Sequence, residues 1–144
     1  MSSQVEVLFE YWKNIDWFVI GGPADDDEAQ AVHARYSDVK CIGFEPVAYH
    51  CSCQNTSGFP GQVINCALWD VDRKVLDLTI PKGATMRSAS VCRPYNAPDV
   101  QSVEVSWVEP ITGRTLDSLS EQLGPFTNVA LWLDIEYAEL AALQ

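Results

Sequence analysis

Residues that could bind a ligand follow three apolar runs of the sequence. Gly21 and Gly22 end the first run, Glu45 ends the second, and Asp134 and Glu136 follow the third. In an open parallel sheet, ligands bind beyond the carboxyl ends of the strands. The three runs, taken as strands, therefore predict one binding crevice that these residues share.

Each group has a defined chemical use. Glycines after a strand let the backbone approach a ligand, with a helix N-terminus behind it. A carboxylate about twenty residues later, at the end of the next strand, can accept hydrogen bonds from both hydroxyls of a ribose. Glu45 occupies that position. Asp134 and Glu136 are expected to face the same crevice or its rim.

The same residues also have interpretations without a ligand. Gly21 and Gly22 precede a proline, which is typical of a tight turn, and each carboxylate can be a solvated charge at a strand end. The acidic run 25–27 suits a helix N-terminus, because consecutive side chains point apart and do not converge on a metal ion. The set 50–53, with one histidine and two cysteines, lacks the second ligand pair of a zinc site. We expect no metal.

The elements that position these residues alternate along the chain. Short apolar runs predict buried strands, and the polar stretches between them predict helices. This alternation predicts an α/β fold with right-handed crossovers and a mostly parallel sheet. Two further runs, 74–80 and 100–109, alternate between apolar and polar residues and predict half-exposed strands in the middle of the chain, joined by a loop over 84–99. The expected buried strands are 17–20, 39–44, 62–68 and 128–133, and the expected helices are 24–36, 47–55, 115–123 and one beginning at 138.

Length and charge limit the function. The 144 residues suit a single domain, 1–144, and the net charge of −11 is unfavourable for binding nucleic acid or an anionic membrane surface. No apolar run approaches the roughly 20 residues of a membrane span. The N-terminus lacks the pattern of a signal peptide, so we expect a cytoplasmic protein. Five cysteines, an odd number without C-x-x-C spacing, predict free thiols.

The chain resembles the amino-terminal two-thirds of the FkbM-like methyltransferases. Phe44-Glu45-Pro46 is similar to a Phe-Glu-Pro that follows a strand in this family, and 133–140 is similar to its Asp-x-Glu-Gly-Ala-Glu. The order of the matching segments carries the resemblance. These segments are 33–46, 65–70, 76–80, the serines at 88 and 90, 114–119 and 133–140.

The resemblance implies a Rossmann-like methyltransferase fold that binds S-adenosyl-L-methionine. Gly21 and Gly22 would hold the methionine part of the cofactor, and Glu45 would hold its ribose. Leu68 or Asp70, after the third strand, would lie near the adenine.

The implied reaction is O-methylation of a small molecule or sugar, with much of the rate supplied by positioning. Asp134 is the first candidate for a general base and Glu136 the second. Ile20, Asp26 and Tyr137 depart from the family pattern, since the family has Asp, Gly and Gly there. The alternative is therefore a catalytically inactive Rossmann-like binding or assembly module.

The family continues with further strands, so the resemblance predicts a sheet that lacks them. Strand 128–133 would then have a bare apolar edge, with residues 129, 131 and 133 on one face and 130 and 132 on the other. Either a middle strand folds back to cover this edge, or a second chain pairs with it. The sequence favours a homodimer, because a twofold dimer is the commonest oligomer and 103–107 alternates like a strand with one wet face.

Overall fold

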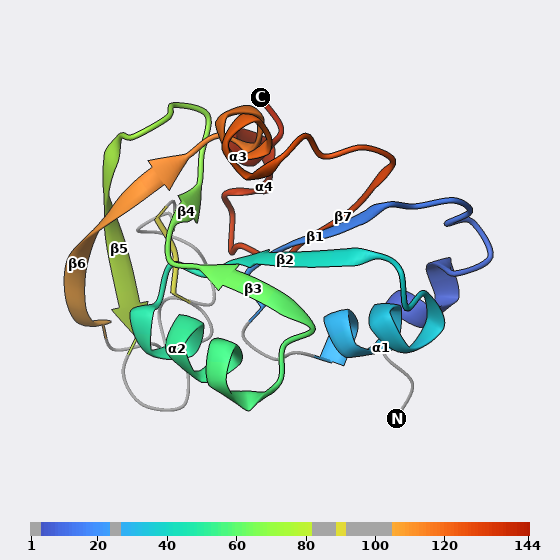
Figure 1. The fold of residues 1–144 in the computed structure, drawn as a ribbon. Coiled ribbons are helices and arrows are strands. Elements are labelled where there is room, and N and C mark those ends of the chain that lie inside the picture. Colours follow the sequence, from blue (N-terminus) through green and yellow to red (C-terminus); the bar gives the residue numbers. More distant parts are fainter. Residues whose placement is uncertain (1–3, 24–26, 82–88, 92–104) are drawn as a thin grey trace.

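The computed structural model describes residues 4–23, 27–81, 89–91 and 105–144 (Figure 1). Its first sheet has four strands in the order β3-β2-β1-β7, and all neighbouring pairs are parallel. The strands are β1 (Trp17–Gly21), β2 (Lys40–Phe44), β3 (Gly61–Ile64) and β7 (Val129–Leu133). The predicted α/β class and mostly parallel sheet are confirmed.

Helices cover both faces of this sheet. The 3-10 helix η1 (Gln4–Leu8), α1 (Asp27–Arg35) and α2 (Ala48–Ser57) pack on one face, and α3 (Leu116–Leu123) and α4 (Glu139–Ala142) pack on the other. The predicted helices thus exist, although residues 24–26 of the first lie outside the described part of the chain.

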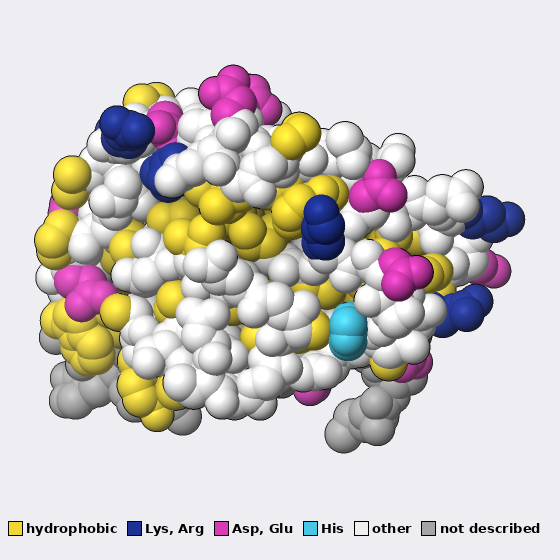
Figure 2. All heavy atoms as spheres, in the orientation of Figure 1, with side chains coloured by type: hydrophobic (Ala, Val, Ile, Leu, Met, Phe, Trp, Pro, Cys, Tyr) yellow, Lys and Arg dark blue, Asp and Glu magenta, His cyan; other side chains and the backbone are white. Residues whose placement is uncertain are grey.

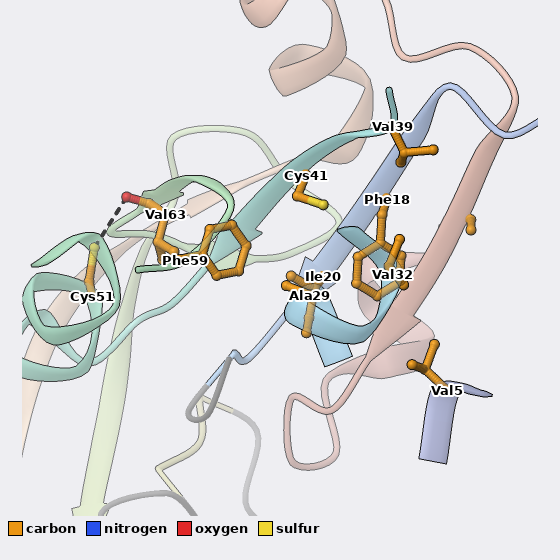
Figure 3. Close-up of a cluster of buried hydrophobic side chains, with 11 residues drawn as sticks. Val5, Phe18, Ile20, Ala29, Val32, Val39, Cys41, Cys51, Phe59 and Val63 are labelled. Carbon is orange, nitrogen blue, oxygen red and sulfur yellow. Dashed lines mark hydrogen bonds between the residues drawn. The ribbon is translucent and has the colours of Figure 1, made fainter. Parts of the chain in front are cut away.

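The cores follow from alternation along β1. Phe18 and Ile20 point to the α1 side, where they pack with Val32 and with residues of β2 and β3 (Figure 3). Val19 points the other way and packs with Leu119 of α3. A central strand buried on both faces needs this unbroken apolar run. The cover on the α3 side is partial, and Figure 2 shows hydrophobic side chains gathered in a band beside α3.

A second sheet contains the middle of the chain. Its order is β4-β6-β5, with β4 (Ala67–Leu68), β5 (Val75–Pro81) and β6 (Val105–Arg114), and β5 and β6 are antiparallel. It stands on the side toward which the first sheet's strands run (Figure 1). Pro110 stands opposite Asp77 of β5. On its other side β4 pairs only with Gly113 and Arg114, so the proline removes no ladder bond to β4. The predicted loop 84–99, except residues 89–91, and strand residues 100–104 lie outside the described residues.

The prediction of one strand over 62–68 is wrong. β3 ends at Ile64, and the chain turns before β4 joins the other sheet. Asn65 causes the turn: its Nδ2 donates to the carbonyl oxygens of Glu45 and Pro46, both at 2.9 Å. Where the chain leaves the first sheet it gives up backbone hydrogen bonds to that sheet. The two bonds from Asn65 and the pairing of Ala67 with Gly113 replace them.

β7 is an edge strand among the described residues, because it pairs with β1 alone. Leu131 and Leu133 pack on the α3 side, and Ala130 and Trp132 pack on the α1 side, as predicted. The described parts of the middle strands form the second sheet and do not cover this edge. In the same part of the chain, no helix has both the length and the hydropathy needed to cross a bilayer.

The open edge carries a test of the expected dimer. Val129 is 42% exposed on β7, so Val129→Lys should leave the fold intact and place a charge beside any strand that pairs there. If β7 pairs with a second copy, we expect self-association to weaken by about tenfold in light scattering at micromolar concentration. Val71→Lys, at an exposed loop position, is the control. A parent protein that stays monomeric in this range contradicts the dimer.

Candidate ligand-binding site

A cavity lies where the strands of the parallel sheet end and the second sheet begins. It contains about 460 Å³ of empty space, its open mouth included. The strand order reverses between β1 and β7, which is where ligands bind in open α/β sheets. Four residues singled out in the sequence line this cavity together: Gly22, Glu45, Leu68 and Asp134.

Glu45 is the buried carboxyl group of the cavity. Its residue surface is 3% exposed, and its Oε1 accepts a hydrogen bond from the Val47 N–H at 2.9 Å. Its own N–H donates to the Ile64 carbonyl at 3.0 Å. The backbone bonds on both sides of Glu45, including that from Asn65, fix the side chain at the cavity wall.

Burial decides the protonation of Glu45. Removal from water raises the pKa of its carboxyl group to about 7, although the bond from the Val47 N–H opposes the shift. No described lysine, arginine or histidine forms an ion pair with it. Glu45 therefore holds a proton in slightly acidic solution, where an exposed glutamate is ionised.

Gly22 has a packing role that its sequence context did not reveal. Its φ is +75°, and a Cβ atom there would lie 2.0 Å from the Asp134 carbonyl oxygen. Only glycine allows the backbone after β1 to approach the end of β7 this closely. Gly21 is buried beneath the cavity and does not line it, because Leu133, Ile135 and Leu68 occupy the space around its Cα.

The turn after β7 carries Asp134. The Asp134 N–H donates to the Gly21 carbonyl at 3.0 Å, and the exposed Asp134 residue lines the cavity. Glu136 does not line it. Glu136 and Tyr137 have φ values of +48° and +75°, so two consecutive non-glycine residues adopt left-handed backbone. Tyr137 stands where the resembling family has a glycine.

Ser90 was missed as a site residue. It is 2% exposed, lines the cavity, and its Oγ donates to the Glu136 carbonyl at 2.5 Å. Its backbone exchanges two hydrogen bonds with Thr79 of β5. Ser90 thereby joins the second sheet to the turn that carries Asp134. The only sequence signal was its place in the serine-containing segment of the family resemblance.

Asp70 lies away from the cavity, on the exposed surface after β4. Asp72, two residues further along the chain, contacts Arg114 and Ser118 at the start of α3 and forms a polar cluster with them. Its Oδ1 accepts from Arg114 Nε at 2.8 Å and from Ser118 Oγ at 2.5 Å. The bonds from Ser118 and Arg114 lower the pKa of Asp72 to about 2. This cluster fastens the β4–β5 connection to the helix.

The described cysteines 41, 51, 53 and 66 are free, and Cys92 lies outside the described residues. Burial raises the pKa of the Cys41 thiol to about 11 and that of Cys66 to about 12, so both stay protonated. The Cys51 thiol is buried in the core, 3.4 Å from the Val63 carbonyl oxygen (Figure 3). Over the described ranges, no group of three potential metal-ligating residues is present.

Comparisons with protein-family models, with curated proteins and with solved structures find no match to this chain.

The buried Glu45 should make stability depend on pH. Its pKa is about 7 in the folded state and 4.5 ordinarily, so the folded protein binds the proton more tightly. The free energy of unfolding should then fall as pH rises from 4.5 to above 7, by about 3 kcal/mol from this group. We expect Glu45→Gln to gain about this much over the parent at pH 8 and nothing at pH 4, in urea unfolding. Glu121→Gln, at an exposed position, should show no such difference. If the free energy of unfolding has the same pH dependence in the parent and in Glu45→Gln, burial does not raise the pKa of Glu45.

The left-handed turn gives a second test, in which the usual order of two substitutions reverses. At an ordinary position glycine is less stable than alanine, but at the φ of Tyr137 alanine is strained. We expect Tyr137→Gly to be more stable than Tyr137→Ala by about 1 kcal/mol in urea unfolding. The same pair at Ala34, an exposed position in α1, should show alanine as the more stable. If alanine is more stable than glycine at position 137 as well, Tyr137 does not have the left-handed backbone conformation described here.

Proposed function

We propose that this chain has a Rossmann-like methyltransferase fold of the FkbM-like type and binds S-adenosyl-L-methionine in the cavity. The proposed reaction transfers the methyl group to an oxygen of a small molecule or sugar. One observation carries the proposal: Glu45, Leu68 and Asp134 come from separate segments of the family resemblance, and they line one cavity together with Gly22. That cavity lies at the reversal of strand order, where open α/β sheets bind ligands.

The chemistry of the cavity wall fits the nucleoside part of this cofactor. Glu45 offers a buried carboxyl group to the two ribose hydroxyls, and Ala67 and Leu68 offer apolar surface to the adenine. Gly22 keeps the end of β1 close to the end of β7, beside which the methionine part would lie. When bound, the cofactor supplies an electrophilic methyl group.

Asp134 is the proposed general base. It is an exposed carboxylate at the cavity, so it can take the proton of an acceptor hydroxyl. The Gly21 carbonyl holds its backbone, and Ser90 holds the turn that follows it. Glu136, the other candidate, does not line the cavity, so the proposal assigns this role to Asp134 alone.

The second candidate is an inactive binding or assembly module. Ile20 favours it, since this residue stands where the resembling family has an aspartate and is 1% exposed within the α1-side core. It offers no polar group to a ligand. Tyr137, in place of a glycine, adds backbone strain near the site.

The proposal extends to the setting of the protein. We propose a cytoplasmic homodimer that acts on a small-molecule or sugar acceptor, without nucleic-acid or membrane partners. The net charge of −11 supports the exclusion of phosphate-rich partners.

Titration with S-adenosylhomocysteine tests the cofactor. At a ligand concentration of 100 times Kd, binding should add about 2.7 kcal/mol to the free energy of unfolding. Glu45→Ala removes the acceptor for two hydroxyl groups, each bond being worth about 1.5–3 kcal/mol. We expect at least about a tenfold loss of affinity in calorimetry. Glu121→Ala on the exposed face of α3 should bind like the parent.

The outcomes separate the two candidates. Equal affinity of Glu45→Ala and the parent contradicts the ribose role. A parent protein that is not stabilised by S-adenosylhomocysteine contradicts the methyltransferase and favours the assembly module.

A further inference from the structure

We infer that ligand binding in the cavity releases the proton held by Glu45, so that affinity for a ligand with a vicinal diol rises with pH through neutrality. This inference rests on the proposed function, because it assumes a nucleoside ligand at Glu45. It adds a regulatory property of the site, namely that the pH of the surrounding solution sets its occupancy.

Glu45 is buried, so its carboxyl group would have to ionise without contact with water. The residue is 3% exposed, and its backbone is fixed by Ile64 and Asn65 on the neighbouring segment. The side chain cannot swing outward without breaking the bond between its Oε1 and the Val47 N–H. Among the described residues, an ionised carboxylate in this position has one hydrogen-bond donor, whereas a carboxylate can accept about four hydrogen bonds.

The charged and titratable groups around Glu45 do not compensate for its charge. On α2, burial raises the pKa of the Cys51 thiol, and the like charge of Glu45 raises it further. From the turn after β7, Asp134 lines the same cavity and is also acidic. The second sheet contributes Ala67, Leu68 and Ser90, and the β3–β4 connection contributes Asn65, all of them neutral. The balance favours the protonated form up to about neutral pH.

A ligand with two adjacent hydroxyls changes this balance. Both hydroxyls can donate to the ionised carboxylate, and hydrogen bonds to a charged acceptor are about twice as strong as those between neutral groups. The protonated acid offers fewer acceptor sites to the same diol. Binding therefore converts the protonated carboxyl group and the free ligand into the carboxylate complex and one proton released to solvent.

The expected pH dependence follows from the protonation of the free protein. With a pKa of about 7, most molecules must lose the proton on binding at pH 6, and few must do so at pH 8. The apparent Kd should be about tenfold weaker at pH 6 than at pH 8. Glu45→Gln cannot release a proton, so its weaker binding should be independent of pH.

Calorimetric titration of S-adenosylhomocysteine measures this directly. At each pH, titrations in two buffers of different ionisation enthalpy give the number of protons released per ligand bound. We expect close to one proton at pH 6 and close to none at pH 8 for the parent and for the control Glu121→Gln, and none at either pH for Glu45→Gln.

Two failures are distinguishable. Binding with equal affinity at both pH values and no released proton overturns this inference and leaves the proposed function standing. Absence of binding at both pH values overturns the proposed function and this inference with it. Proton release that persists in Glu45→Gln assigns the linkage to another group and also overturns the inference.

Discussion

The close approach of two backbones, at Gly22 and at Asp134, is the constraint on which the site depends. A side chain at Gly22 would collide with the Asp134 carbonyl oxygen, and the Asp134 N–H reaches the Gly21 carbonyl in the same place. These contacts bring the ends of β1 and β7 together. Without them the strand order would still reverse, but the cavity would lose the wall that carries its exposed carboxylate.

Among the described residues, Ser90 makes a polar link between the second sheet and the turn that carries Asp134. Ser90 is paired with Thr79 through the backbone and with the Glu136 carbonyl through its hydroxyl. The turn it contacts is strained at Tyr137, and the wall opposite holds Glu45 in an environment that disfavours its charge. Backbone strain and a carboxyl group with a raised pKa thus occur around the same cavity, as is typical of functional sites.

Sequence reasoning located the strand ends because glycine and carboxylate residues come directly after unbroken apolar runs. It could not locate the break after Ile64, because Asn65 acts on the carbonyl groups of Glu45 and Pro46, twenty residues away. Ser90 and the Asp72 cluster were missed for the same reason, since their partners are more than 40 residues distant. Local patterns predict the elements and the residue types at their ends, but they do not predict which distant polar groups meet.

The position of β7 has a consequence for how the chain folds. β1, α1, β2, α2 and β3 succeed one another directly along the chain, whereas Thr127 meets Asp16 across 111 residues. Contacts of such high sequence separation form slowly. During synthesis, one edge of β1 stays unpaired until β7 has been made, and this edge can pair with other strands or bind chaperones. The cavity wall that carries Asp134 is in place only once β7 has paired with β1, so variants that delay this pairing should lose ligand binding while the β1–β2–β3 unit is still intact.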